Sequence, residues 1–324
     1  MSGIAVVSNP RSGTNRQRPA LVGQLAETLG TAGEVVEPRT LAELEAAVRT
    51  FRARDVKVVC VNGGDGTLHK VLSAMVVVYG DGARGADLRA LELPKLAILK
   101  GGTLNTMASN LDQKIGGLDF LRLIGAAMKA DAPLATVDRT AMVVNGCHAG
   151  FLFGTGVLYR FMRMYEEGTP PGPMKALGLV ARVCGSTAIG GALAARVFAP
   201  DAALVSLDGQ AWTPPAYAAI AVGTMNDIGL GFKLFHRASQ NPGYLHVIGF
   251  HCPPMSVLSR FYRIPLGRPL ERPDITDVLG QRLCIMGEAA RGFMMDGDFV
   301  DGTSELEVEA GPTVRFVVGS HAEA

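Results

Sequence analysis

Residues 58–70 read VVCVNGGDGTLHK, and this stretch decides how the first part of the chain folds. An apolar run ends at two glycines, and Asp65, Gly66 and Thr67 then lead into a pattern with helical spacing. A loop between a buried strand and a helix lies at the carboxyl end of the strand, where ligands bind in open α/β folds. Its glycines let the backbone approach a ligand closely, and helix amides face an anion. The stretch therefore predicts a phosphate-binding junction.

The carboxylate of Asp65 restricts this prediction, because it repels phosphate unless a cation lies between them or a hydroxyl proton has to be accepted. Asp65 therefore suggests Mg²⁺ binding or general-base work in phosphoryl transfer. The alternative interpretation is an N-cap aspartate in a tight turn, which needs only local amide partners.

The first 130 residues alternate between strand and helix patterns, which predicts parallel β-α-β units and a covered sheet. A capping-box spacing from Thr40 to Glu43 marks one helix start. Residues 83–95 are expected to form a surface loop or short insertion. The expected strands are 4–9, 34–38, 56–61 and 96–100, and the expected helices are 18–29, 40–54, 67–79 and one near Asn105.

After about residue 135 the pattern changes to short strands separated by turn residues, which predicts a largely antiparallel β-rich domain, a β-sandwich. Helical interruptions are expected near 155–190 and 254–263. The expected strands are 140–146, 195–199, 203–209, 218–224, 244–250, 282–287, 292–298 and 305–310.

The composition excludes several classes of protein. A formal net charge of +1 argues against a general nucleic-acid binder. The five scattered cysteines indicate a reduced, cytosolic chain, and His246, His251 and Cys252 lack the second cluster that a zinc site needs, so packed residues are expected there. Residues 174–198 are too polar and too rich in small residues for a spanning helix and are interpreted as a buried or groove-lining helix. Any membrane contact is then peripheral.

Two further loops follow predicted parallel strands. Residues 6–13, VVSNPRSG, contain Asn9, Ser12 and Gly13, and residues 100–108, KGGTLNTMA, contain Gly102, Thr103 and Asn105. Since the carboxyl ends of parallel strands meet at one sheet edge, we expect these loops to converge with Gly63, Gly64, Gly66 and Thr67 on one nucleotide site. Neither the P-loop pattern nor the dinucleotide fingerprint is present.

A fourth element, Met295-Asp296-Gly297-Asp298, lies far along the chain. In a strand, residues two apart share a face, so both carboxylates would point the same way. One could accept a hydroxyl proton while the other holds a metal. The alternative is an Asp-Gly hairpin turn at the surface.

These four elements, in this order, resemble the diacylglycerol kinase catalytic-domain family, which includes bacterial lipid kinases, sphingosine kinases and ceramide kinases. Residues 6–13 look like its N-P-x-S-G start, residues 63–67 match G-G-D-G-T, residues 102–108 look like G-T-x-N-x-x-A, and residues 296–298 resemble D-G-E. Weaker similarity covers residues 144–156 and 222–233.

The resemblance implies a nucleotide-binding domain over residues 1–134, with a C-terminal return at about 305–324, and a β-rich lipid-binding domain over residues 135–304. It places the active site in the cleft between them. It implies that residues 63–67 cradle ATP phosphates, that Asp65 and Asp296 are catalytic, and that Asp298 and Asp65 hold Mg²⁺. Which of Asp65 and Asp296 takes the proton stays open.

Several positions depart from the family pattern. Asp298 stands where glutamate is usual, Lys100 replaces a proline, Thr106 replaces an aspartate, and Lys70 stands where glutamate is common. Residues 241–246, NPGYLH, replace an aspartate-rich stretch that holds a structural metal in some bacterial members, which leaves that metal in doubt here. His69 is expected to be a packing or hydrogen-bonding residue.

The leading hypothesis is an ATP- and Mg²⁺-dependent lipid kinase, a phosphotransferase with an alcohol group as acceptor. Its substrate would be diacylglycerol or a sphingolipid such as ceramide or sphingosine, met at the inner face of the membrane by a cytoplasmic, peripherally associated protein. Residues 151–164 and 174–195 are candidates to line the acyl-chain pocket, with plain core as the alternative. An NAD kinase and a non-catalytic lipid-binding relative remain alternatives, and the oligomeric state, including a homodimer, stays open.

Overall fold

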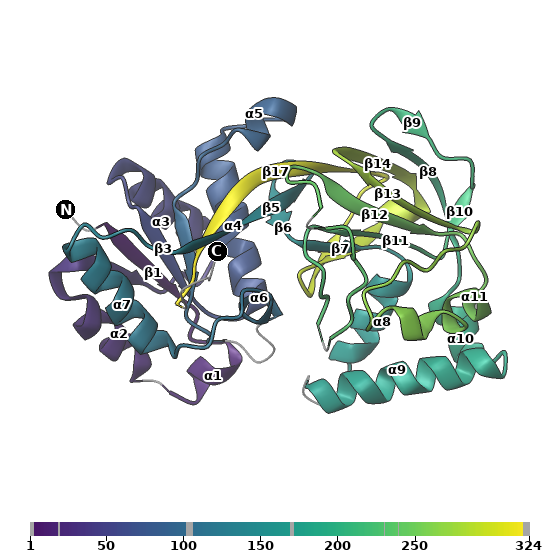
Figure 1. Ribbon diagram of the computed structural model, residues 1–324, viewed down its shortest axis with the longest axis horizontal. Helices are drawn as coiled ribbons and strands as arrows, with labels where there is room; N and C mark the ends of the chain where they lie inside the picture. Colours follow the sequence, from purple (N-terminus) through teal and green to yellow (C-terminus); the bar gives the residue numbers. More distant parts are fainter. Residues whose placement is uncertain are drawn as a thin grey trace. The chain divides into compact units, whose positions relative to one another are not determined.

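The computed structural model describes residues 3–18, 20–101, 106–168, 172–229, 231–238 and 240–319. The chain divides into two compact units, shown in Figure 1. The first comprises residues 1–141, 146–149 and 311–324, and the second comprises residues 142–145 and 150–310. These limits differ from the expected boundaries at 134 and 305 because strands β5 and β17 each run from one unit into the other.

The first unit is built on a parallel sheet in the order β2-β1-β3-β4-β17. β1 and β3 are buried along their whole length, which explains why they read as continuous apolar runs. The predicted parallel sheet is confirmed. Its strands are β1 (Ile4–Ser8), β2 (Gly33–Val36), β3 (Val58–Asn62), β4 (Lys95–Ile98) and the end of β17 (Glu305–Val317), with β5 (Thr136–Val144) and β6 (His148–Gly150) attached through β17.

Helices cover both faces of this sheet, as Figure 1 shows. α2 packs against α7, and their apolar side chains share a core with Ile4, Val6 and Val58. α3 packs against α4 on the opposite side. The helices are α1 (Gly13–Arg16), α2 (Leu21–Leu29), α3 (Leu41–Ala53), α4 (Asp65–Gly80), α5 (Gly85–Arg89), α6 (Thr106–Asn110) and α7 (Gly117–Lys129), with a 3₁₀ turn η1 (Gly30–Ala32).

The start of α3 follows the capping pattern read from the sequence. Thr40 has extended backbone angles, and its hydroxyl accepts a hydrogen bond of 3.1 Å from the amide of Glu43. The Glu43 carboxylate accepts in return from the amide of Arg39, 2.7 Å away, rather than from Thr40. Both bonds satisfy amides that lack a partner within the helix.

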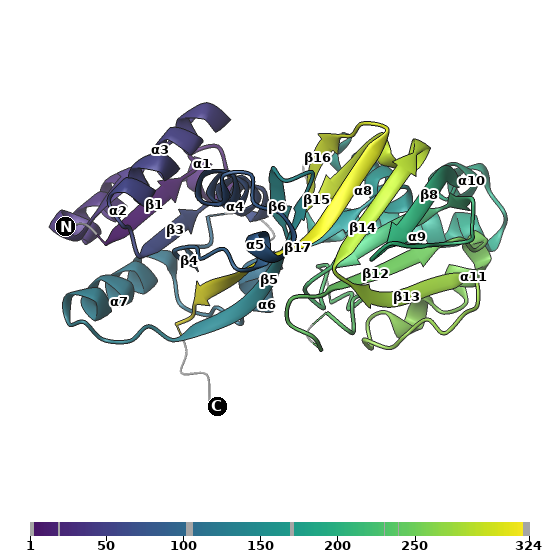
Figure 2. The ribbon, with the colours of Figure 1, turned by 90° about the horizontal axis from the view of Figure 1, so that it is seen from above.

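The second unit is a β-sandwich, as predicted, because apolar side chains from two sheets share one core. One sheet, with strands side by side in Figure 2, has the order β10-β8-β14-β17, and the other has the antiparallel order β13-β12-β11-β7-β15-β16. The further strands are β7 (Leu152–Gly154), β8 (Asp201–Leu207), β9 (Gln210–Ala211), β10 (Ala216–Tyr217), β11 (Ala219–Gly223), β12 (Leu245–Phe250), β13 (Ile275–Gly280), β14 (Arg282–Gly287), β15 (Gly292–Met295) and β16 (Asp298–Asp301).

Both helical interruptions expected in the second unit are present. The first contains α8 (Val157–Glu166) and α9 (Pro173–Ala188), followed by α10 (Ala192–Val197). The second contains α11 (Pro254–Leu258) and the 3₁₀ turn η2 (Phe261–Arg263), and a further turn, η3 (Glu288–Ala290), precedes β15. Figure 1 shows α8 to α11 gathered on one side of this unit, with α9 outermost.

Four expectations are wrong in detail. Residues 195–199, expected as a strand, form the end of helix α10 and the two residues after it. The prediction failed because a short apolar run fits a helix and a strand equally well. Residues 292–298 form two strands joined by a turn, and residues 85–89 of the expected loop form α5. Residues 174–198, interpreted as one buried or groove-lining helix, form two helices, α9 and α10, and the inner side of α9 packs with Tyr165 and Val197 while its outer side is exposed.

Within the described residues, no helix combines the length and the apolar character that a bilayer-spanning segment requires.

Replacing Thr40 by alanine removes the acceptor for the Glu43 amide. We expect the Thr40→Ala variant to lose about 1 kcal/mol of free energy of unfolding, measured by urea denaturation. Thr50→Ala is a matched control on the same helix, because the Thr50 hydroxyl bonds only the carbonyl of Ala46 in the preceding turn. Equal losses in the two variants would contradict the capping role.

Candidate active site

Three loops meet at the carboxyl edge of the first unit's sheet, and Asn62 at the end of β3 is their anchor. The Asn62 carbonyl accepts from the amide of Asn9 and from the side chain of Asn15, each at 3.0 Å. The Asn62 side chain donates to the hydroxyl of Ser8 at 3.0 Å. The ends of β1 and β3 are thereby fixed to each other by buried polar contacts.

The loop after β1 also reaches both other loops. The Asn9 side chain donates to the Thr67 hydroxyl at 3.0 Å, and the Ser12 hydroxyl donates to the carbonyl of Gly101, also at 3.0 Å. Gly13 follows as the first residue of α1. The structure therefore brings Asn9, Ser12, Gly13 and Thr67 together.

Glycine at position 63 is a packing requirement. A Cβ atom there would collide with the side chain of Thr67, one turn into α4. Gly64 is the N-cap of that helix, with extended backbone angles, and Gly66 lies in its first turn. The loop is thus drawn tightly over the start of α4, where helix amides favour an anion.

Asp65 is not the N-cap that the alternative interpretation expected. It is the first residue of α4, and its Oδ1 accepts a 3.2 Å hydrogen bond from the amide of Met107 in α6. The carboxylate thus joins the loop after β3 to the segment after β4. This contact orients Asp65 at the edge where the loops meet and also gives it a structural role.

The third loop is described only in part, because Gly102, Thr103 and Asn105 lie outside the described residues, as does the side chain of Thr106. Lys100 has φ of +57°, a left-handed conformation that proline cannot adopt. A proline at position 100 would therefore not fit the backbone of this chain. The Lys100 ammonium donates to the carbonyl of Gln113, which holds this turn against the start of α7.

Two neighbours of the motif have simpler roles. His69 is buried, and its Nδ1 lies 2.9 Å from the carbonyl of Ala149, with its ring stacked on His148. The expected packing and hydrogen-bonding role of His69 is confirmed. Lys70 is exposed on the surface of α4.

In the second unit, Asp296 lies in a hairpin turn. Met295 pairs with Asp298, and the two residues between them, Asp296 and Gly297, have φ of +48° and +92°. These angles describe the Asp-Gly turn favoured between twisted strands. The expectation that both carboxylates share one face of one strand is therefore wrong, because Asp298 begins the next strand.

The Asp296 carboxylate has defined partners. Its Oδ1 accepts from the amides of Leu152 at 2.8 Å and Phe151 at 3.1 Å, and its Oδ2 lies 3.2 Å from the Phe151 amide. The preceding residue must be glycine, since a Cβ at Gly150 would collide with Oδ2. Asp296 thus fixes the β15–β16 hairpin to the start of β7.

Asp298 is accompanied by Glu166, a carboxylate that the sequence did not single out. Partial burial and the negative charge of Asp298 raise the pKa of Glu166, and Arg163 and Lys175 oppose that rise. Carboxylate oxygens are the ligands that a hard cation such as Mg²⁺ takes, and a cation would offset the repulsion between these two charges. Nothing in the sequence spacing links residues 166 and 298, so only folding reveals this pair.

The segment 151–164, a candidate to line an acyl-chain pocket, begins in the hydrophobic core of the second unit. Phe151, Leu152 and Phe153 are buried, and Phe153 packs among the residues of both sheets. For these three residues the plain-core alternative describes the structure.

Comparison with known proteins agrees with this architecture. Residues 3–137 match the family model of the diacylglycerol kinase catalytic domain. The resemblance read from the motifs is therefore confirmed. No curated protein matches the chain.

Solved structures extend the match in fold to the second unit. A diacylglycerol kinase from Bacillus anthracis strain Sterne has 16% sequence identity and a TM-score of 0.62, over 98% of this chain and 97% of that one. Two further structures of candidate diacylglycerol kinases from the same organism have 16% and 17% identity and TM-scores of 0.66 and 0.65, with the same coverage. At this identity the likeness establishes the two-part fold.

Removing the Asp296 carboxylate leaves the buried amides of Phe151 and Leu152 without their acceptor. We expect Asp296→Ala to lower the free energy of unfolding by about 1–3 kcal/mol, and hydrogen exchange at these two amides to accelerate. Asp301→Ala, an exposed position on the same hairpin, is the control. Unchanged exchange in Asp296→Ala would contradict the anchoring role.

Proposed function

We propose that this protein is an ATP- and Mg²⁺-dependent lipid kinase that phosphorylates a hydroxyl of diacylglycerol or of a sphingolipid such as ceramide or sphingosine. The observation that carries the proposal is the set of strand-end loops around Asp65, held together by side-chain hydrogen bonds, in a unit that matches the diacylglycerol kinase catalytic domain. An anion at the start of α4 would meet helix amides and a hydroxyl donor from Thr67.

In this proposal the residues of the first unit position the nucleotide. The loops at Asn9, Ser12 and Gly13 and at residues 63–67 cradle the phosphates, together with Gly102, Thr103 and Asn105. Bound Mg²⁺ would offset the negative charge of the transferred phosphoryl group. Asp65 and Asp298 are the carboxylates that we propose as metal ligands.

Either Asp65 or Asp296 accepts the proton of the lipid hydroxyl. Asp296 already accepts two backbone amides, which fixes its orientation. Asp65 accepts from the amide of Met107 at the longer distance of 3.2 Å. A general base must lie within reach of the proton it removes, and these contacts alone do not decide which aspartate does so. The activities of the asparagine variants of Asp65 and Asp296 would decide it.

Phosphotransfer is tested with labelled Mg-ATP and a panel of diacylglycerol, ceramide, sphingosine and phosphatidylglycerol in micelles, with NAD⁺ as a water-soluble acceptor. We expect label in a lipid lane, and a rate reduced by about 100-fold or more in Asp65→Asn. Asp81→Asn, at the C-cap of the same helix, should keep full activity.

The outcomes of this assay separate the alternatives. Label on NAD⁺ alone would replace the lipid-kinase proposal by an NAD kinase. ATP binding without transfer to any acceptor would favour a non-catalytic lipid-binding relative. Full activity of Asp65→Asn would remove Asp65 from the mechanism.

A lipid kinase has to meet its substrate at a membrane, and the outer face of α9 suits such contact. Six of the eleven exposed large apolar or aromatic side chains of the described residues lie on α9, on α11 and in the segments that follow them. They are Met174, Leu177, Ile189, Met255, Tyr262 and Leu266, with exposed fractions from 45% to 84%. α9 and α11 pack against each other, so these residues belong to one region, the α9–α11 face.

The charges around this face favour an anionic bilayer as its partner. Residues 172–198 contain Lys175, Arg182 and Arg196 and no acidic residue, and residues 253–268 contain three arginines and no acidic residue. The whole chain, by contrast, has a net charge of only +1. Apolar side chains bordered by cations are typical of helices that lie in the interface of anionic membranes.

We expect the chain to sediment with vesicles that contain phosphatidylglycerol and to bind neutral phosphatidylcholine vesicles more weakly. Burying one isoleucine side chain is worth about 1.5–3 kcal/mol, so Ile189→Asp should weaken vesicle binding by roughly 10-fold or more. Leu204→Asp, at an apolar site on β8 that is 69% exposed, is the control.

Equal loss in Ile189→Asp and Leu204→Asp would contradict the assignment of the α9–α11 face. Sedimentation as a dimer that Ile189→Asp converts to a monomer, without any vesicle binding, would assign this face to a second copy of the chain instead.

A further inference from the structure

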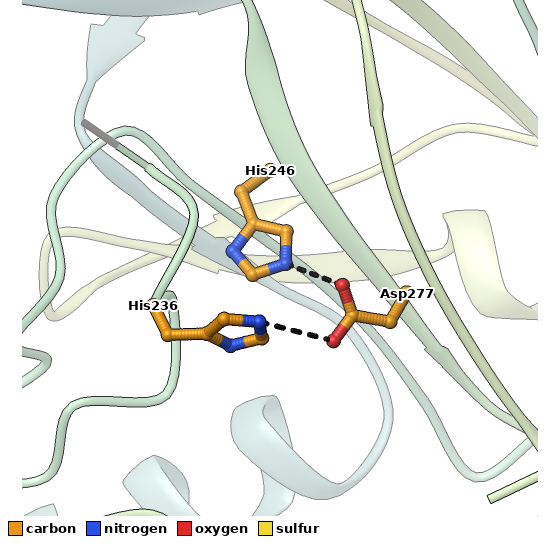
Figure 3. A group of neighbouring side chains, drawn as sticks. All are labelled: His236, His246 and Asp277. Atoms are coloured by element: carbon orange, nitrogen blue, oxygen red, sulfur yellow. Dashed lines mark hydrogen bonds and ion pairs between the residues drawn. The ribbon is translucent and has the colours of Figure 1, made fainter. Parts of the chain in front are cut away.

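Two histidines and an aspartate of the second unit meet at the edge of its six-stranded sheet, shown in Figure 3. His246 lies on β12, and Asp277 lies on the neighbouring strand β13. Because Ile248 pairs with Asp277, His246 and Asp277 are diagonal neighbours on one face. His236 comes from the connection between β11 and β12, which passes over the same face.

The three side chains direct their ligand atoms to one point. Nε2 of His246 lies 2.9 Å from Oδ1 of Asp277, and Nε2 of His236 lies 3.8 Å from Oδ2. All three ligand atoms lie within 4.8 Å of one another. Donors that hold one ion tetrahedrally at about 2.0–2.2 Å lie about 3.3–3.6 Å apart, so small side-chain shifts would bring this set to the required separations.

The donor types select the class of ion. Imidazole nitrogen suits Zn²⁺ and other first-row transition ions, whereas Mg²⁺ and Ca²⁺ take oxygen ligands. A set of two imidazoles and one carboxylate therefore differs from the oxygen donors assigned to Mg²⁺ in the proposed phosphotransfer. Of these three residues only His246 belongs to the stretch 241–246, so the set is not a remnant of that stretch.

The surroundings of His236 and Asp277 favour the forms of these two groups that bind metal. His246 is fully buried, and burial lowers the pKa of His236, so its imidazole stays neutral near pH 7 with a lone pair available. Burial raises the pKa of Asp277, but the hydrogen bond from His246 and the neighbouring positive groups outweigh it, and the net pKa lies below its ordinary value.

Solvent reaches this group through a pocket of about 320 Å³ that is lined by His236 and Asp277 together with Arg237, Glu271 and Arg272. The pocket leaves room for a water molecule or another ligand to complete the coordination of an ion. Arg237 is the nearest cation, with its guanidinium 3.6 Å from Oδ1 of Asp277 and 3.2 Å from the Asp277 carbonyl. Arg237 therefore pairs with the carboxylate of Asp277 and leaves the rings of His236 and His246 in place beside it.

Two contacts of His246 must change when an ion binds. The amide of Arg237 points at Nδ1 of His246 over 3.4 Å, so this ring carries its proton on Nε2 and donates it to Asp277. An ion on Nε2 requires the other tautomer, with the proton on Nδ1. The 2.9 Å bond to Asp277 and the longer contact from the Arg237 amide are then both replaced, by metal bonds to Nε2 and to the carboxylate.

We propose that His236, His246 and Asp277 form a binding site for one divalent first-row transition ion of the Zn²⁺ class, which fastens the β11–β12 connection to β12 and β13. Residues 224–244 form this long connection, and Phe235 already packs on Gly223 and His246. A bound ion would add a third attachment through His236. The site is separate from the phosphotransfer proposal and is tested without any activity measurement.

The test measures Zn²⁺ binding to the whole chain after dialysis against a chelator. Calorimetry should give one tight Zn²⁺ per chain, and a hundredfold excess of Mg²⁺ should not displace it. Co²⁺ at the same site should give a visible absorption band that Zn²⁺ abolishes. Affinity should fall at acidic pH, because protons then compete with the ion for its ligands.

Variants assign the binding to these residues. His236→Ala and Asp277→Asn should each weaken Zn²⁺ binding more than about 10-fold. Mutating even a residue that only hydrogen-bonds to a metal ligand typically lowers metal affinity by about 10-fold or more. His236→Cys should restore it, because a thiolate also binds Zn²⁺. His251→Ala is the matched control in the same unit, where the ring packs against Tyr217.

Two results would overturn the proposal. The first is the absence of stoichiometric Zn²⁺ binding to the native chain, which would leave the three side chains as a hydrogen-bonded cluster. The second is Zn²⁺ binding that His236→Ala and Asp277→Asn leave unchanged while both variants remain folded by circular dichroism.

Discussion

Buried polar groups at the ends of β1 and β3 must find partners inside the protein, and they find one another. Asn62 accepts from the backbone of Asn9 and the side chain of Asn15 and donates to Ser8. An unpaired buried amide lowers the free energy of unfolding by about as much as a lost hydrogen bond, so the fold has to keep these contacts. The positions of the loops that carry Ser12, Thr67 and Asp65 all depend on this anchor.

Carboxylates act as loop anchors in both units. Asp65 accepts from the start of α6, and Asp296 accepts from the start of β7. In each case the aspartate lies beside glycines whose missing side chain makes room, Gly63 next to Thr67 and Gly150 next to Asp296. A residue that holds a loop in place is also held in place itself, and a fixed carboxylate is what proton transfer or metal binding requires.

The second unit presents two surfaces with different chemistry. The α9–α11 face is apolar and bordered by arginines, whereas the pocket beside Asp277 is lined by charged and imidazole groups. The long connection between β11 and β12 passes over the sheet at that pocket, fastened by Phe235 and Arg237. We propose the first surface as a contact for a lipid phase and the second as a site for an ion, so the two proposals concern separate parts of the second unit.

The sequence by itself determined the parallel sheet, the β-sandwich, the cap at Thr40 and the convergence of the loops after β1 and β3, because each depends on local periodicity or on a turn residue. It failed at residues 195–199, where a short apolar run is ambiguous between helix and strand, and at Asp296, whose turn places Asp298 on the next strand. The exposure of the outer side of α9 and the electrostatic interaction between Glu166 and Asp298 become visible only in the folded chain. The same holds for His236, His246 and Asp277, because contacts between residues that are far apart along the chain depend on strand pairing and helix packing, which leave no fixed spacing in the sequence.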